Sequence, residues 1–256
     1  MTKSVAIVTG SSSGIGRATA LRLARDFSAV VLAARSGENL TQVSDLVQKT
    51  GTESLVIEID LSMPASAEIV IKETLTRFER IDALINIAGA VAGLDVFQMA
   101  DDQWDSGMAL KFHGARRLAI HAWPALKTTK GTIVFISGNA ADIPKAASAA
   151  VASINAAIEA LAKAFADRGL EDGVQVNSVS PGAILTGRRL AMLERAASAK
   201  NIGLDEMKKA FLKQAGIGRF GEPEDIAELI AFAVSPSSRF MTGTVLRMDG
   251  GEVKSL

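Results

Sequence analysis

The chain has 256 residues, 28 basic and 28 acidic side chains and no cysteine. Zero net charge gives no reason to expect nucleic acid or an anionic membrane as a partner. The lack of cysteine excludes disulfides, thiolate catalysis and cysteine-ligated zinc. The chain's 2 histidines are too few for a metal site, so we expect no metal. No apolar run reaches the ~20 residues of a bilayer span, and the first residues do not form a signal peptide, so we expect a cytoplasmic protein.

Short runs rich in β-branched residues alternate with longer helical stretches along the chain. The runs predict strands at Val5–Thr9, Ala29–Ala34, Ser54–Ile59, Ala83–Ile87, Thr132–Ser137, Val174–Val179 and Thr244–Met248. Most are apolar at nearly every position, as expected of a parallel sheet covered on both faces. Helix starts are indicated near Ser62 and Pro64 and again at Pro223. We therefore expect a single doubly wound α/β domain of the Rossmann type over residues 1–256.

A glycine-rich motif lies between the first strand and the first helix, with Gly10, Gly14 and Gly16 in the pattern G-x-x-x-G-x-G. Glycines let the turn close and let backbone N–H groups approach a pyrophosphate. The helix that follows adds the positive end of its dipole. The position of the motif, more than its spacing, predicts a dinucleotide-binding loop rather than a plain glycine turn.

The second strand is followed by Arg35. An acidic residue at this place would bind the ribose hydroxyls of NAD, whereas an arginine suits the 2′-phosphate of NADP. We therefore expect NADP as the cofactor, with NAD as the less favoured choice. The alternative is a solvated arginine at the end of a strand.

Several segments resemble the short-chain dehydrogenase/reductase family, and the resemblance covers the whole chain. Thr9–Gly16 is similar to its cofactor loop, Leu84–Gly89 to its Asn-Asn-Ala-Gly segment with Ile87 in place of the second Asn, and Val176–Thr186 to the segment beside the nicotinamide. The resemblance implies an oxidoreductase that forms a homotetramer or homodimer. It also implies a set of cofactor-binding residues: Gly10, Ser12, Ser13, Gly14, Ile15, Gly16, Arg35, Asp60, Leu61, Asn86, Ala88, Gly89, Pro181, Gly182, Ile184 and Thr186.

The catalytic positions of the family are replaced. The family uses a Tyr that exchanges the proton, a Lys that lowers the Tyr pKa, a Ser that binds the substrate oxygen and an Asn that supports a water relay. The matching positions here are Val151, Asn155, Gly138 and Lys111, and the chain has no tyrosine. Ser137 lies one residue before the Ser position, so on a continuous strand it would face away from the substrate.

Lys111, Ser137 and Asn155 are the weak catalytic candidates that remain. Lys111 would either reach the space of the family lysine, held there by Asn155, or point to solvent from its helix. Glu159 is expected to lie too far along the helix from Val151, about two turns, to replace the tyrosine. Asp142 and Lys145 are expected to be ordinary loop charges.

Three functions stay open on these grounds. The first is an atypical NADP(H)-dependent oxidoreductase, and the second is a catalytically silent NADP-binding pseudoenzyme with a structural or regulatory role. The third is a partner subunit that supports an active homologue. We take the oxidoreductase as the class and leave the small-molecule substrate open. The basic segment 187–216 is expected to cover the substrate, and Arg188 and Arg189 either favour an anionic substrate or only solvate this segment.

Overall fold

A seven-stranded parallel sheet forms the centre of the computed structural model, which describes residues 4–255. The strand order is β3-β2-β1-β4-β5-β6-β7, which confirms the predicted doubly wound α/β fold. The strands are β1 (Val5–Thr9), β2 (Ala29–Ala34), β3 (Glu53–Glu58), β4 (Ala83–Asn86), β5 (Thr132–Ile136), β6 (Gln175–Pro181) and β7 (Val245–Met248).

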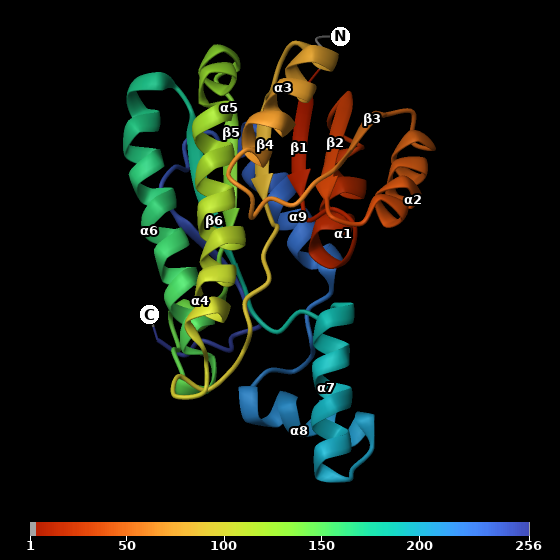
Figure 1. The fold of residues 1–256 in the computed structure, drawn as a ribbon, viewed down its shortest axis with the longest axis vertical. Coiled ribbons are helices and arrows are strands. Elements are labelled where there is room, and N and C mark those ends of the chain that lie inside the picture. Colours follow the sequence, from red (N-terminus) through yellow and green to blue (C-terminus); the bar gives the residue numbers. More distant parts are fainter. Residues whose placement is uncertain (1–3, 256) are drawn as a thin grey trace.

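Helices cover both faces of the sheet (Figure 1). One face carries α3 (Ser66–Phe78), α5 (Ala115–Thr129) and α6 (Ala149–Asp172). The other carries α1 (Gly14–Leu23), α2 (Gly37–Gln48) and α9 (Pro223–Ala233). Three more helices lie beyond the carboxyl ends of the strands: α4 (Asp101–Gly107), α7 (Gly187–Lys200) and α8 (Leu204–Ala215).

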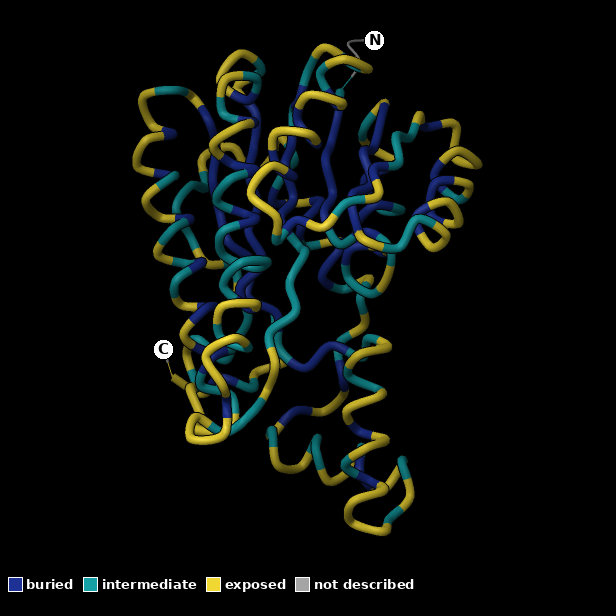
Figure 2. The backbone as a smooth tube through the Cα atoms, in the orientation of Figure 1, coloured by how far each residue is buried: buried dark blue, intermediate teal, exposed yellow. Residues whose placement is uncertain are grey.

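The core follows the alternation of side chains along each strand. In β1, Val5 and Ile7 pack toward the α3, α5 and α6 face, while Ala6 and Val8 pack toward the α1, α2 and α9 face. All four are fully buried, and Figure 2 shows the strands as the buried centre of the molecule. Continuous apolar runs therefore correspond to strands that are covered on both faces.

The helical segment Ala146–Asp172 has the length and mean hydropathy, 1.4, of a membrane-spanning helix, although no such run was expected from the sequence. Ile154 and Ile158 on this segment are buried, and Ile158 belongs to the cluster of side chains that covers the sheet. The apolar composition of the helix is thus used for packing against the sheet.

The predicted helix start near Ser62 and Pro64 is wrong, because α3 begins at Ser66. The carboxylate of Asp60 accepts a hydrogen bond from the backbone N–H of Ser62 at 2.9 Å, and the Ser66 hydroxyl donates to the Asp60 carbonyl at 2.6 Å. These local bonds hold the intervening residues in turns. The start of α9 at Pro223 is confirmed.

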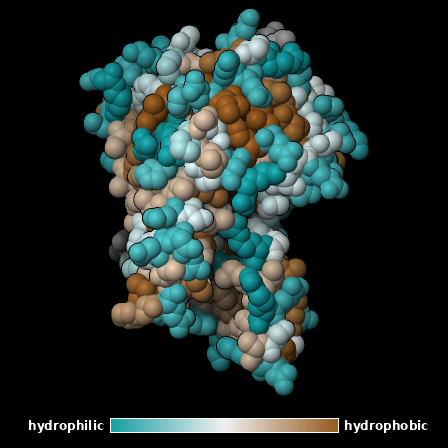
Figure 3. Space-filling model, in the orientation of Figure 1, coloured by the Kyte–Doolittle hydropathy of each residue, from teal (hydrophilic) through white to brown (hydrophobic). Residues whose placement is uncertain are grey.

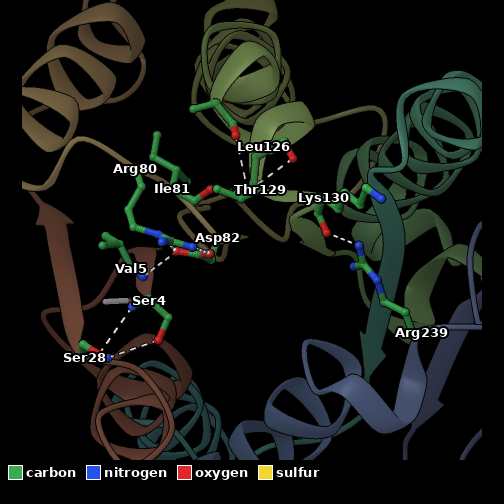
Figure 4. A network of polar contacts seen from close by, with 11 residues as sticks. Ser4, Val5, Ser28, Arg80, Ile81, Asp82, Leu126, Thr129, Lys130 and Arg239 are labelled. Carbon is green, nitrogen blue, oxygen red and sulfur yellow. Dashed lines mark hydrogen bonds and ion pairs between the residues drawn. The ribbon is translucent and has the colours of Figure 1, made fainter. Parts of the chain in front are cut away.

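The amino ends of the strands are tied by a polar network (Figure 4). Arg80 donates two hydrogen bonds to the carboxylate of Asp82, at 2.9 and 2.6 Å, and Asp82 accepts from the backbone N–H of Val5 at 2.8 Å. The Thr129 hydroxyl donates to the Ile81 carbonyl at 2.7 Å. These bonds join the starts of β1 and β4 to the end of α5, so the opposite edge is left for the site.

Candidate active site

A cleft of about 440 Å³ lies at the carboxyl ends of the strands, where β1 and β4 are neighbours and the strand order reverses. Ligands of open α/β sheets bind at such a switch point. The surface is hollowed between the body and the lobe formed by α7 and α8 (Figure 3). The predicted covering segment 187–216 thus contributes Gly187 and Arg188 to the lining of the cleft, next to Thr186.

The glycine loop has a conformation that requires glycine. Gly10 and Gly14 have φ angles of +66° and +52°, which other residues rarely adopt. A Cβ on Gly16 would lie 2.1 Å from the carbonyl oxygen of Gly10, so the helix could not pack this closely on the turn. The loop therefore exposes backbone N–H groups and a helix N-terminus to the cleft, as binding of a pyrophosphate requires.

Thr9 fixes the loop against the end of β4. Its hydroxyl accepts hydrogen bonds from the backbone N–H groups of Ile87 and Ala88, at 2.9 and 3.0 Å, and donates to the carbonyl of Ile85 at 3.3 Å. The two strand ends that form the floor of the cleft are thus held in register. Reasoning from the sequence did not single out this role of Thr9.

Most of the predicted cofactor-binding residues line the cleft: Gly10, Ser12, Ser13, Gly14, Ile15, Gly16, Arg35, Leu61, Ala88, Gly89 and Thr186. Outside its lining are Asp60, Asn86, Pro181, Gly182 and Ile184. Asn86 is buried, and neither atom of its side-chain amide has a hydrogen-bond partner among the described residues. The carboxylate of Asp60 accepts a hydrogen bond within the turn that follows it, from Ser62. Hydrogen bonds from Ser62 lower the pKa of this carboxyl group.

Apolar residues that were not predicted complete the cleft. They come from strand ends and from the helix that leads into α5: Ala34, Ile59, Ile87, Ala90, Leu110 and Ile136. Leu110 lies beside Lys111, and the others lie near or just after the ends of predicted strands. The order of the strands in the sheet would have been needed to predict that these ends meet at one cleft. These residues give the cleft an apolar surface between its polar groups.

Lys111 lies in a π-helical turn, Met108–Gly114, which connects α4 to α5. Turns of this kind are rare and often occur at functional sites. The ammonium group of Lys111 donates one hydrogen bond to the carbonyl of Ser137 at 3.0 Å and another to the side-chain oxygen of Asn155. Lys111 therefore lines the cleft and does not point to solvent.

Burial lowers the pKa of Lys111 from its ordinary value to about 8. This value of about 8 already includes two smaller effects, because the positive charge of Arg188 also lowers the pKa and the carboxylate of Glu159 raises it. An ammonium group with this pKa is mainly protonated at neutral pH and can release its proton there.

Asn155 occupies the space above Gly138. Its amide nitrogen donates to the Gly138 carbonyl at 3.3 Å, and a Cβ on Gly138 would lie 2.8 Å from that nitrogen. Gly138 also has a φ of +156°, which disfavours other residues. Gly138 and Asn155 are thus sterically matched to each other.

Ser137 and Glu159 form a second polar contact behind Lys111. The Ser137 hydroxyl donates to the Glu159 carboxylate at 2.7 Å, and it also lies 3.3 Å from the Val179 carbonyl. Burial raises the pKa of Glu159, while the hydrogen bond from Ser137 opposes this shift. The sequence contained a signal for this contact, because Glu159 follows Asn155 by four residues and shares its helix face.

The other charged candidates, Asp142 and Lys145, do not line the cleft. Asp142 pairs with Arg247 at 3.0 Å, and Lys145 is exposed. Val151 lies in the first turn of α6, four residues before Asn155, and brings no polar group. The polar groups that converge here are therefore those of Lys111, Asn155 and the Ser137 backbone.

A parallel sheet with a glycine loop, a helix N-terminus and a cleft at its switch point defines a dinucleotide-binding α/β protein of the Rossmann type. The family model described as enoyl-(acyl carrier protein) reductase matches residues 10–252. A 3-oxoacyl-[acyl-carrier-protein] reductase of Staphylococcus aureus is 30% identical over 253 residues, which are 98% of each chain. The chain belongs to the short-chain dehydrogenase/reductase family.

Solved structures of reductases have the same fold. L-sorbose reductase from Gluconobacter frateurii, in complex with NADPH and L-sorbose, has a TM-score of 0.95 and 27% identity, and the match covers 100% of this chain and 98% of that one. An NADPH-dependent reductase involved in bacilysin biosynthesis has a TM-score of 0.92 and 26% identity, with 99% of this chain and 100% of that one covered.

Proposed function

We propose that this protein is an NADPH-dependent oxidoreductase that reduces a carbonyl or imine group, with Lys111 as the proton donor. The glycine at position 16 lets α1 pack closely on the turn, where a side chain would collide with it. This close packing supports a dinucleotide as ligand, because backbone N–H groups and the helix N-terminus face the cleft. Arg35 lines the same cleft, where a guanidinium group suits a 2′-phosphate. The similar structures of L-sorbose reductase and the bacilysin-pathway reductase are described with NADPH, which supports the same cofactor here.

NADPH bound in the cleft would supply the hydride for the carbon of the substrate. The proton for the oxygen or nitrogen has to come from the protein, and the chain has no tyrosine to provide it. The observation that carries the proposal is the pair of hydrogen bonds from the Lys111 ammonium to Asn155 and to the Ser137 carbonyl.

Two of the three N–H groups of Lys111 are held by these acceptors, and one is left for a substrate atom in the cleft. The pKa of about 8 makes the ammonium a stronger acid than an ordinary lysine, so it transfers its proton more readily near neutral pH. After transfer, the neutral amine keeps N–H donors for the same two acceptors. Lys111 therefore stays in place until it takes up a proton again, which the negative charge of Glu159 favours.

The alternative function is an NADP-binding pseudoenzyme. It is favoured by Val151, which brings no proton donor to the tyrosine position, and by the absence of tyrosine from the chain. In that case the cleft would bind NADP as a structural or regulatory ligand, and Lys111 would only fill space between α6 and the end of β5.

A panel of carbonyl and imine substrates with NADPH, assayed on the wild type and on Lys111→Ala, tests the proposal. We expect turnover by the wild type and a loss of about 10² to 10⁴ in rate for the variant, the contribution of a general acid. Lys145→Ala is the matched control, because Lys145 is an exposed lysine on the loop before α6. NADPH binding without turnover of any substrate would favour the pseudoenzyme, and unchanged turnover in Lys111→Ala would exclude the role of Lys111.

We further propose that the protein is a homodimer or homotetramer, as its family suggests. Large apolar side chains on its surface support an interface between copies, with Phe240 fully exposed and Leu170 70% exposed. Sedimentation velocity measures the state directly, and a monomer at all concentrations would contradict this proposal.

A further inference from the structure

The charges that line the cleft are all positive. They are Arg35, Lys111 and Arg188, and the described residues that line the cleft include no aspartate or glutamate. Arg35 follows β2, whereas Arg188 comes from the first turn of α7 and faces the same end of the cleft as Lys111. A second cation therefore lies near the proposed proton donor, and its charge lowers the pKa of Lys111.

Arg188 is held next to Lys111 by a glycine that both residues contact. Its guanidinium group donates to the carbonyl of Gly89 at 3.0 Å, which is its only hydrogen bond within residues 4–255. A Cβ on Gly89 would lie 3.1 Å from the Cδ atom of Lys111, so the lysine side chain packs directly on this glycine. The remaining N–H groups of Arg188 are free for a ligand in the cleft.

The neighbouring Arg189 does not share this position. Its guanidinium group lies 5.3 Å from the centre of the Phe211 ring, so it packs onto α8 and is absent from the lining of the cleft. Of the two arginines that the sequence pointed to, only Arg188 is therefore available to the site.

We infer that Arg188 binds an anionic group of the substrate, so that the protein acts on oxo acids or similar carbonyl compounds that carry a carboxylate or phosphate. This inference rests on the proposed function, because it places the carbonyl oxygen at Lys111. An arginine forms charge-assisted, often paired, hydrogen bonds with such anions. An anion at Arg188 would also balance two cations that otherwise repel each other across Gly89.

The same guanidinium group could bind a phosphate of the cofactor, and the test separates these two sources of an anion. Isothermal titration calorimetry on the protein saturated with NADP⁺ measures substrate binding where no hydride is available. The probes are pyruvate, acetoacetate and levulinate, each compared with its methyl ester. They place the carbonyl at increasing distances from the carboxylate and differ from the esters mainly in charge.

We expect the wild type to bind at least one of these acids about tenfold or more tightly than its ester, as charge-assisted hydrogen bonds suggest. Arg188→Met removes this preference and leaves the affinity for the ester and for NADP⁺ within about twofold. Arg195→Met is the matched control, because Arg195 is exposed on the same helix and bonds only to the carbonyl of Ala191 among the described residues.

The inference is overturned if no acid is preferred over its ester, if Arg188→Met keeps the preference, or if the variant loses affinity for NADP⁺ by the same factor. The last result assigns Arg188 to the cofactor instead. Failure of the proposed function has a different outcome, since it appears as the absence of turnover with NADPH while the preference for the acid in this binding experiment is unaffected.

Discussion

The ammonium group of Lys111 donates a hydrogen bond to the side-chain oxygen of Asn155, which joins the π-helical turn before α5 to the second turn of α6. The family resemblance places an asparagine at the first of these positions and a lysine at the second. On that resemblance the two residue types are expected to have exchanged places, and the structure shows the polar pair that they form. The positive charge of the pair is that of Lys111, which lies in the turn before α5 and packs on Gly89.

Exchanging the pair back tests whether the two residues depend on each other. Asn155→Lys alone places a second ammonium group against Lys111 in a buried position, and Lys111→Asn alone removes the charge. The double variant restores one lysine and one asparagine. We expect it to be more stable than the sum of the two changes by roughly 1 to 3 kcal/mol, a coupling typical of residues in contact. Chemical denaturation of the four proteins measures this coupling, and additive effects would contradict it.

Glu159→Gln tests the electrostatic support of Lys111. The carboxylate raises the pKa of Lys111, so its removal lowers that pKa below about 8. The glutamine keeps the size of the side chain and can accept from Ser137. We expect the decline of the reduction rate at alkaline pH to begin at a lower pH than in the wild type, with the rate at neutral pH little changed.

Glu171→Gln is the control for this experiment. Glu171 lies on the same helix, is exposed and pairs with Arg168 at 3.0 Å, far from the cleft. Its variant should keep the wild-type pH profile. An unchanged profile in Glu159→Gln would show that the carboxylate only holds Ser137.

Gly138→Ser introduces the residue type that the family resemblance leads us to expect at this position. The new Cβ would lie 2.8 Å from the amide nitrogen of Asn155, at a φ of +156°. We expect a loss of roughly 1 to 3 kcal/mol in the free energy of unfolding, the range for overpacking. Gly93→Ser is the control, because a Cβ there has no atom within 4 Å. Equal stability of the two variants in urea denaturation would mean that Asn155 moves aside without cost.

Arg35→Ala tests the choice between the two nicotinamide cofactors. If Arg35 binds the 2′-phosphate, the variant loses affinity for NADPH by roughly tenfold to a hundredfold, the contribution of hydrogen bonds to a charged group. Affinity for NADH, which lacks this phosphate, should not change. Fluorescence titration with both cofactors measures this, with Arg25→Ala as control, because Arg25 is exposed in the turn after α1. An equal preference in wild type and variant would remove the assignment.

Much of the fold could be predicted from the sequence because buried parallel strands have continuous apolar runs. β1 and β2 have the predicted bounds, and the glycine loop lies where the motif indicated. Local patterns failed where side chains compete with the helix for backbone groups. The Asp60 carboxylate accepts a hydrogen bond from the backbone N–H of Ser62, and α3 begins at Ser66, four residues after the expected cap.

The site could be predicted only in part, because its contacts join segments that are distant in the sequence. The family positions raised the pairing of Lys111 with Asn155 as one of two possibilities, and the choice between the cleft and solvent depended on packing. The contact of Glu159 with Ser137 was not predicted. Glu159 is far from Val151 along the helix, but it shares a helix face with Asn155, which brings it to the end of β5. The match between Gly138 and Asn155 required the backbone of the β5–α6 connection.

The central claim is that Lys111 donates the proton, and the pH dependence of a single turnover tests it most directly. The protein, in excess over bound NADPH, is mixed with a saturating reducible carbonyl substrate, and the loss of NADPH absorbance is followed for the wild type and for Lys111→Met. Lys111 carries its proton below a pKa of about 8, so the wild-type rate should be constant at neutral pH and fall as pH rises through that value.

Lys111→Met should be slower by about 10² to 10⁴, with a rate that no longer falls in this range of pH. Its affinity for NADPH should match that of the wild type. A variant that keeps both the rate and the alkaline decline of the wild type would contradict the account, because another group would then be the proton donor.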